Sequence, residues 1–492
     1  MTDLGVLHDA RRCMPAHFTA FYDGQFQEPI DGQYFDTFSP GDGKVVGKVA
    51  FAGVKDTEAA LQAAQRACAA WATVPPLDRA NLLRRVAGVL REHATELATL
   101  DALNTGSPIT TMKGDAYAAA DQIEFFAGMI PAVTGDTHDV GQETFNYTIR
   151  EPLGVVARIV ASNHPLMFTA CKLAAPLAMG NTVVIKPPEQ APLSALRLME
   201  LIGDIFPRGV LNVLTGGADC GRALSTHPLV NKITLIGSAP VGRAIQRAAA
   251  DTLKLSLFEL GGKNALVAYP DAEIERLVNG VVAGMNWAWC GQSCGSTSRV
   301  FLHETIHDDV LRQVARKLEE KFRPGNPLHS ATTMGSMVSK TAQDRVLKYI
   351  DSAKQEGARL VIGGGPPVTA DTVGGYFVEP TIFADVEHHM TVAREEIFGP
   401  VLSVLKWEDE DEMFEQVNDV EYGLTGAVFT SNIGTMQRAV RNIQSGTVWV
   451  NMVGTHFLGM PFGGYKQSGI GKEECLEELY GMTQCKAVHV KL

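Results

Sequence analysis

Two cysteines lie close together in the stretch NWAWCGQSCGSTSR, residues 286–299. A zinc site would need additional ligands, and the two histidines downstream come without a second cysteine pair. A disulfide between Cys290 and Cys294 is disfavoured by their short spacing and by an expected reducing compartment. The remaining hypotheses are an ordinary buried thiol and a nucleophilic sulfur. The glycines around Cys294 favour it as the nucleophile, because backbone there can approach a substrate, and Cys290 is expected on a pocket wall.

Two polar residues stand where apolar runs end. Glu259, in FELGGKN, precedes two glycines, and burial there would raise the pKa of its carboxyl group toward the range of a general base. A solvated acid or an ion pair with Lys263 is the ordinary alternative. Asn163, in ASNHP, offers an amide donor to a developing oxyanion, although an asparagine before His-Pro commonly forms a turn.

The elements that must position these residues follow a βαβ pattern. Between residues 153 and 262, the runs GVVARIVAS, NTVVIKP, GVLNVLTGG, NKITLIGS and KLSLFELGG alternate mostly with Ala/Leu-rich helical segments. This pattern predicts a parallel sheet covered by helices, with ligands at the carboxyl ends of its strands, where ASNHP and ELGG fall. A second α/β pattern follows. The predicted fold class is therefore α/β, with two doubly wound (Rossmann-like) domains.

Composition and charge narrow the function classes. The chain has 492 residues, 45% of them hydrophobic and 20% charged, with a formal net charge of −12. This acidic balance argues against nucleic-acid partners, and no apolar run approaches the ~20 residues of a membrane span. The N-terminus lacks the apolar region of a signal peptide. We expect a cytoplasmic protein with reduced thiols and neither a nucleic-acid nor a membrane partner.

Five further motifs accompany these elements in order: KPPEQAPLSA, IGSAPVG, REEIFGPV, EYGLTGAVFT and PFGGYKQSGIGKE. With them, the chain resembles the aldehyde dehydrogenase superfamily from about residue 20 to its end. The resemblance implies an NAD-binding domain over residues 1–133 and 152–262 and a catalytic domain over 263–475. It also implies a small β oligomerisation element over 134–151 and 476–492, and hence a homodimer or homotetramer.

The resemblance assigns roles to the three candidate catalytic residues. Cys294 matches the nucleophile, which attacks an aldehyde to give a thiohemiacetal; hydride transfer to a nicotinamide then leaves a thioester. Asn163 matches the asparagine that holds the oxyanion together with the backbone N–H of the nucleophile. Glu259 matches the general base that activates the hydrolytic water, which favours a free acid over transfer to coenzyme A. No metal is implied.

The same resemblance implies a nicotinamide cofactor. Lys186 and Glu189 match residues at the adenine ribose, where a carboxylate favours NAD and leaves NADP as the weaker alternative. Gly237 and Ser238 stand at a turn near the pyrophosphate, in place of a G-x-G-x-x-G motif. Glu396 and Phe398 match residues around the nicotinamide and its ribose.

The substrate pocket is the least determined part of the prediction. Aromatic side chains near the motifs suit an apolar or aromatic aldehyde, or a quaternary-ammonium (betaine-type) aldehyde bound by cation–π contact, and core packing is an equal alternative for each. Trp289 and Ser162 depart from the asparagine and the aromatic residue that the family usually has at their positions. The candidate wall residues are His164, Phe168, Trp287, Trp289, His456 and Phe457.

Two other functions compete with aldehyde oxidation. A cysteine esterase would use Cys294, Asn163 and Glu259 without hydride transfer, but it would not need the KPPE and EEIFGP motifs. A catalytically idle structural protein on the same scaffold would not need the three polar residues.

Overall fold

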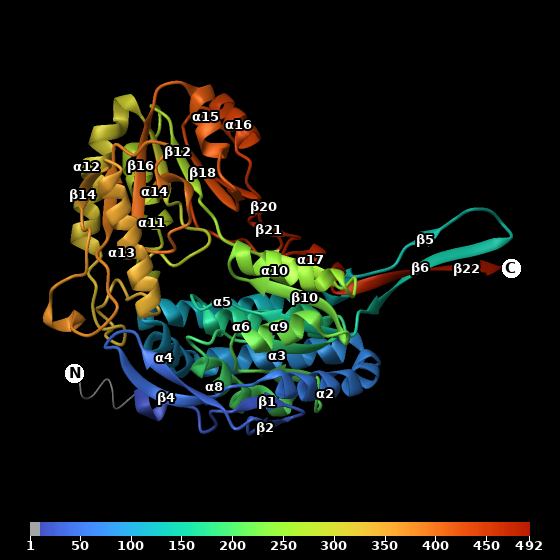
Figure 1. Ribbon diagram of the computed structural model, residues 1–492. Coiled ribbons are helices and arrows are strands. Elements are labelled where there is room, and N and C mark those ends of the chain that lie inside the picture. The colour runs from blue at the N-terminus through green and yellow to red at the C-terminus, as the bar shows by residue number, and fades with distance from the viewer. Residues whose placement is uncertain (1–9) are drawn as a thin grey trace.

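The computed structural model describes residues 10–492, which form two α/β bodies and a protruding arm (Figure 1). The first sheet has eight strands in the order β2-β1-β9-β8-β7-β10-β11-β21. Its central strands, from β9 to β11, run parallel. The strands are β1 (Ala20–Tyr22), β2 (Gln25–Gln27), β7 (Val155–Ile159), β8 (Thr182–Lys186), β9 (Leu211–Val213), β10 (Val230–Ile236), β11 (Leu255–Glu259) and β21 (Gly469–Ile470).

Helices cover both faces of this sheet. Strands β7 and β8 are buried along nearly their whole length, as apolar runs in a parallel sheet are expected to be. One apolar core packs α3, α5, α6, α7 and α8 against one face, and a second packs α2, α9 and α10 against the other. The helices of this body are α2 (Val54–Ala72), α3 (Pro76–Glu92), α4 (Ala94–Thr105), α5 (Ile109–Met129), α6 (Pro165–Cys171), α7 (Ala174–Ala178), α8 (Leu193–Ile202), α9 (Ala218–Thr226) and α10 (Ala239–Ala250), with short 3-10 turns η1 (Ile130–Ala132) and η2 (Gly203–Ile205).

The second body repeats this plan. Its seven strands follow the order β14-β15-β16-β13-β12-β18-β19, and all neighbours are parallel except the β14–β15 pair. The strands are β12 (Ala265–Ala268), β13 (Arg299–His303), β14 (Arg359–Ile362), β15 (Thr381–Ala384), β16 (Val401–Trp407), β18 (Thr425–Phe429) and β19 (Thr447–Val450). The helices are α11 (Ile274–Gly284), η3 (Trp287–Trp289), α12 (Glu304–Lys321), α13 (Lys340–Gln355), η4 (Ala370–Thr372), α14 (Thr391–Arg394), α15 (Glu410–Asn418) and α16 (Ile433–Asn442).

The arm is a three-stranded antiparallel sheet in the order β22-β6-β5. β6 (Thr144–Pro152) pairs with β22 (Thr483–Lys491) along its whole length, and the short β5 (Thr137–His138) lies on its other side. Figure 1 shows the arm extending away from both bodies. Two small hairpins complete the fold: β3 (Tyr34–Ser39) with β4 (Lys44–Ala50), and β17 (Tyr422–Gly423) with β20 (Tyr465–Lys466).

The C-terminal segment returns from the second body to the first. β21 adds to the edge of the first sheet beside β11, and α17 (Leu476–Tyr480) follows it. Leu479 and Met482 lie in the core of the first body. A buried ion pair of 2.8 Å between Arg158 on β7 and Glu478 fixes this segment. It therefore packs with the first body, although the sequence assigned residues 263–475 to the catalytic domain and 476–492 to the oligomerisation element.

The fold class predicted from the sequence is confirmed, since each body is a doubly wound, mostly parallel sheet. The exact domain boundaries, 1–133 with 152–262, 263–475, and 134–151 with 476–492, stay a prediction. From residue 10 onward, no helix combines the length and the apolar character that a bilayer crossing requires.

Candidate active site

Cys294 lies in the loop between η3 and β13, and one asparagine fixes that loop. The Asn264 side-chain amide donates to the backbone carbonyl oxygens of Cys294 at 2.7 Å and Ser296 at 2.9 Å. Its own carbonyl oxygen accepts the backbone N–H of Thr425 at 3.0 Å. Asn264 is 4% exposed, so these hydrogen bonds are shielded from water. The backbone at Cys294 is thus linked through Asn264 to Thr425, the first residue of strand β18.

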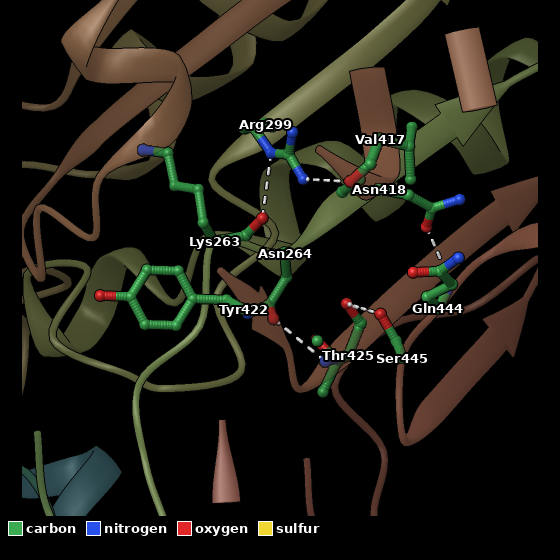
Figure 2. A pocket seen from close by; sticks show the side chains of 11 residues that line it. Lys263, Asn264, Arg299, Val417, Asn418, Tyr422, Thr425, Gln444 and Ser445 are labelled. Atoms are coloured by element: carbon green, nitrogen blue, oxygen red, sulfur yellow. Dashed lines mark hydrogen bonds between the residues drawn. The ribbon is translucent and has the colours of Figure 1, made fainter. Parts of the chain in front are cut away.

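A buried arginine, Arg299, supports the backbone next to Asn264, as Figure 2 shows. The Arg299 guanidinium donates to the carbonyl oxygens of Lys263 at 2.9 Å, Gln416 at 3.0 Å and Val417 at 2.8 Å. The hollow among these residues has a volume of about 10 Å³. That is space for about one water molecule and far too little for a substrate, so this hollow is structural.

The glycines near the two cysteines allow neighbouring backbone segments to pack closely. Gly291 has a φ of +67°, and a Cβ atom there would lie 2.2 Å from the carbonyl oxygen of Gly399. Cys290 is 0% exposed in the core of the second body. The prediction that Cys290 forms a pocket wall is therefore wrong, because its side chain packs inward. Cys290 and Cys294 are both free thiols.

Glu259 ends strand β11, and two glycines bring that strand end against the Cys294 loop. A Cβ atom on Gly261 would lie 2.0 Å from the Glu396 carboxylate, and one on Gly262 would lie 2.7 Å from the carbonyl oxygen of Cys294. Larger residues would push these segments apart. The backbone N–H of Gly262 also donates to the Glu396 carboxylate at 3.0 Å. Glu259, Cys294 and Glu396 consequently gather around one point.

The Cys294 thiol and the Glu259 carboxylate affect each other's ionisation. The Cys294 thiol lies close enough to the Glu259 carboxylate for each group to shift the pKa of the other. Burial raises the pKa of Glu259, which is 4% exposed, to about 8. Burial and the nearby Glu259 carboxylate raise the pKa of the Cys294 thiol well above its usual range. Among the described residues, Lys263 forms no ion pair with Glu259, and its ammonium group is buried without a hydrogen-bond partner.

Two residues that the sequence did not single out lie behind Glu259. Lys172 pairs with Glu473 at 3.0 Å, with side-chain exposures of 5% and 4%. The Glu473 charge raises the pKa of Glu259, and the Lys172 charge opposes that shift. Glu473 lies within the PFGGYKQSGIGKE motif, but nothing in the sequence connects that motif to Lys172 on the chain after α6. The charges of Lys172 and Glu473 therefore act on the pKa of Glu259 in opposite directions.

Asn163 has the properties that an oxyanion donor needs. It is 7% exposed, and among the described residues its side-chain amide donates no hydrogen bond. The same holds for the backbone N–H of Cys294, while the backbone N–H of Gly295 donates to the sulfur. A turn-forming asparagine would use its side chain locally, so the structure disfavours that alternative.

A cleft of about 1040 Å³ opens at the carboxyl ends of β7, β8 and β10. Five of the six predicted cofactor residues line it; these are Lys186, Glu189, Gly237, Ser238 and Phe398. The sixth, Glu396, lies beside it at Gly262. Ser238 is the N-cap of α10, so a helix N-terminus faces the cleft, which is an arrangement that suits a pyrophosphate. Ser162 and Gln292 connect the cleft to the loops that carry Asn163 and Cys294.

Three of the predicted pocket residues form one cluster. The His164 ring lies 5.3 Å from the Phe168 ring and 5.2 Å from the Trp289 ring. His164 Nδ1 also contacts the Asp115 carboxylate at 2.7 Å. These residues come from α5, the start of α6, and η3.

The other three predicted pocket residues lie elsewhere. His456 contacts Glu474 at 2.9 Å and the Phe462 ring at 4.4 Å, and Phe457 beside it is 57% exposed. Trp287 is 1% exposed in the core between the second sheet and α11 and α12. We therefore leave Trp287 out of the pocket, because its indole packs against the sheet.

The segment His303-Glu304-Thr305-Ile306-His307 has the spacing of a zinc-protease motif. Its histidines are used locally: His303 caps α12 and packs on the Trp407 ring at 4.7 Å, and His307 contacts Asp308 at 2.7 Å. Over residues 10–492, no group of three or more His, Cys, Asp or Glu side chains could hold a metal ion.

Replacing Glu259 with Gln removes a negative charge that raises the pKa of the Cys294 thiol. We expect iodoacetamide to alkylate Cys294 in Glu259→Gln protein about tenfold faster than in the wild type at an alkaline pH, because a lower thiol pKa gives more thiolate. Mass spectrometry of the Cys294 peptide gives the rate. Slower alkylation would instead identify Glu259 as the base that generates the thiolate.

Comparison with known proteins places this geometry in a family. Residues 26–488 match the model of the aldehyde dehydrogenase family. An aldehyde dehydrogenase from Talaromyces stipitatus is 52% identical over 485 residues, covering 97% of this chain and 94% of the relative. A betaine aldehyde dehydrogenase from Brucella anthropi is 41% identical, with coverages of 96% and 97%.

Solved structures agree. The NAD+ complex of an aldehyde dehydrogenase from Bacillus cereus has a TM-score of 0.94 at 36% identity, covering 100% of this chain and 99% of that chain. An indole-3-acetaldehyde dehydrogenase, also in complex with NAD+, has a TM-score of 0.96 at 34% identity and covers both chains fully, at 100%. The chain described here is therefore a member of the aldehyde dehydrogenase family.

Proposed function

We propose that this enzyme oxidises an aldehyde to the carboxylic acid with NAD, through a thiohemiacetal and a thioester on Cys294. The observation that carries the proposal is the contact between the Cys294 thiol and the buried Glu259 carboxylate, beside a cleft of about 1040 Å³. A thiol nucleophile, a base of raised pKa and a cofactor-sized cleft are the parts that this reaction needs.

In the first half of the reaction, the Cys294 thiol loses its proton to solvent and the sulfur attacks the aldehyde carbon. The carbonyl oxygen becomes an alkoxide, which the free amide of Asn163 and the free backbone N–H of Cys294 can stabilise. The residues that line the cleft would hold NAD, which would supply the acceptor for the hydride that the tetrahedral carbon releases. Loss of that hydride leaves a thioester on Cys294.

In the second half, Glu259 accepts a proton from water, and the resulting hydroxide attacks the thioester carbon. The C–S bond then breaks, the acid leaves, and the Cys294 sulfur takes up a proton. Burial supports this role, since a carboxylate with a pKa of about 8 is a much stronger base than an exposed one. The presence of Glu259 favours water over coenzyme A as the acceptor.

The cofactor assignment rests on the cleft and on the relatives. Structural neighbours include NAD+ complexes. Glu189 is exposed and lines the cleft beside Gly217, where an added Cβ atom would lie 3.1 Å from its carboxylate. A carboxylate at the adenine ribose would accept the 2′-hydroxyl and repel a 2′-phosphate, which favours NAD over NADP.

We propose an apolar or aromatic aldehyde as the substrate, because His164, Phe168 and Trp289 form an aromatic cluster next to Asn163. A quaternary-ammonium aldehyde is the second candidate. One relative is a betaine aldehyde dehydrogenase, and aromatic rings also bind such cations. An esterase without hydride transfer would have no use for the residues that line the large cleft.

We also propose that the chain forms a homodimer or a homotetramer through its arm. β22 is the edge strand of the arm sheet and is exposed along most of its length. An exposed edge of this length presents unpaired backbone N–H and C=O groups, which another subunit can cover.

The catalytic roles predict a specific pattern in two variants. Cys294→Ala should reduce no NAD with any aldehyde. Glu259→Gln should reduce about one equivalent of NAD rapidly and then slow by about 10²–10⁴-fold in steady state, because the thioester accumulates.

The wild-type deacylation rate should rise with pH through about 8, as Glu259 ionises, and the rise should vanish in Glu259→Gln. Stopped-flow absorbance of the reduced nicotinamide checks each point; unchanged steady-state turnover in Glu259→Gln would refute its role.

The cofactor preference should shift when the charge at the ribose is removed. In Glu189→Gln, kcat/KM with NADP should rise about tenfold relative to that with NAD, since one repulsion of about 1.4 kcal/mol is lost. Steady-state kinetics with both cofactors measures the ratio. Glu408→Gln, an exposed site outside the cleft, is the matched control.

Blocking the edge of the arm should change the assembly. We expect Ala487→Pro to lower the mass seen by light scattering toward that of one chain. The backbone N–H of Ala487 points away from β6 to the free edge of β22, and proline removes that donor. A wild-type protein that is already monomeric would contradict the proposal.

A further inference from the structure

We propose that the His164–Asp115 pair selects an aryl aldehyde whose ring carries a hydroxyl group, by accepting that hydroxyl as a hydrogen-bond donor at His164 Nε2. The inference rests on the proposed function and specifies its substrate class. It concerns a polar group within an otherwise apolar wall.

The orientation of the imidazole follows from its partner. His164 Nδ1 lies 2.7 Å from the Asp115 Oδ2 oxygen, with side-chain exposures of 14% and 8%. An ionised carboxylate only accepts hydrogen bonds, so Nδ1 must carry the proton. In the neutral imidazole, Nε2 then presents a lone pair. The pair thus defines an acceptor of fixed direction.

That acceptor is not used by the protein. Among the residues from 10 onward, His164 makes its only hydrogen bond through Nδ1. Its ring contacts the Phe168 ring edge-to-face at a centroid distance of 5.3 Å and the Trp289 ring at 5.2 Å with the planes tilted by 51°. An aromatic ligand bound beside this cluster would gain ring contacts of the same kind. A ring hydroxyl on that ligand could then satisfy Nε2.

The position of the cluster relative to the reacting atoms supports this role. His164 directly follows Asn163, and Trp289 ends η3, just before the loop of Cys294. Ser162 and Gln292, on the same two segments, line the cofactor cleft, whereas His164, Phe168 and Trp289 do not. The cluster is therefore carried by the Asn163 and Cys294 segments but stands outside the lining of the cofactor cleft, which leaves it free to contact an aldehyde bound at Cys294.

A purely structural histidine would hold α5 to the start of α6 and have no effect on substrate choice. Asp101 already holds this start, because its carboxylate accepts the backbone N–H of Leu166 at 3.1 Å. The distinguishing property is therefore the hydrogen-bond acceptor at Nε2, which one substitution can remove.

The test compares 3- and 4-hydroxybenzaldehyde with their methyl ethers and with benzaldehyde, as kcat/KM with NAD at neutral pH. The wild type should favour the hydroxyl compounds over the ethers by about tenfold, the value of one buried hydrogen bond with a favourable geometry. In His164→Phe, which keeps an aromatic ring, this ratio should fall to about one.

Asp115→Asn tests the role of the carboxylate. The asparagine lacks the charge that holds the proton on Nδ1, so Nε2 is no longer held as an acceptor. The ratio should then fall toward one, because a hydroxyl oxygen and an ether oxygen accept equally from an N–H donor at Nε2. Asp121→Asn is the matched control on the same helix; its carboxylate is 62% exposed and pairs with Arg91, and the ratio should stay at the wild-type value.

Binding separates this inference from the proposed function. Quenching of tryptophan fluorescence in Cys294→Ala protein reports affinity for the same compounds without turnover. An equal preference in wild type, His164→Phe and Asp115→Asn, in both assays, overturns the selection by His164. A preference in binding with no aldehyde oxidation by the wild type supports His164 and overturns the proposed reaction instead.

Discussion

The site depends on one contact, that of the Cys294 thiol with the Glu259 carboxylate in a place with little water. The two groups come from different bodies, since Glu259 ends a strand of the first sheet and Cys294 precedes a strand of the second. Gly261 and Gly262 allow the approach, because a side chain at either position would collide with Glu396 or with the Cys294 backbone. The resulting burial raises the pKa of the Glu259 carboxyl group and of the Cys294 thiol.

Buried hydrogen bonds of Asn264 and Arg299 hold the Cys294 loop in place around this contact. Asn264 fixes the carbonyl of Cys294, and the Arg299 side chain fixes the carbonyl of Lys263, which precedes Asn264. These are buried hydrogen bonds, which lose more when broken than exposed ones do. Among residues 10–492, the backbone N–H of Cys294 and the amide of Asn163 donate no hydrogen bond, as their proposed role as oxyanion donors requires.

Buried charge links the site to the C-terminal part of the chain. Lys172 with Glu473 and Arg158 with Glu478 are ion pairs whose side chains are at most 5% exposed. Desolvation makes such pairs poor sources of stability, and removing one partner is strongly destabilising. Their effect is to fix the C-terminal segment against the first sheet and to set the field at Glu259. A segment distant in sequence thereby affects the pKa of Glu259.

The sequence by itself determined the fold class and the family, because apolar periodicity and ordered motifs can be recognised along the chain. It also singled out Cys294, Glu259 and Asn163, whose roles stay a proposal, and five residues that line the large cleft. Four of these, Lys186, Glu189, Gly237 and Ser238, end or follow strands of the first parallel sheet, whereas Phe398 comes from the second body. The sequence could not separate Trp287 from Trp289: both flank the same short turn, yet one packs on the second sheet and the other faces His164. Nor could it connect Lys172 to Glu473 or His164 to Asp115. Such pairs depend on how helices and loops far apart in sequence pack together, and only the tertiary structure decided which buried charge meets which.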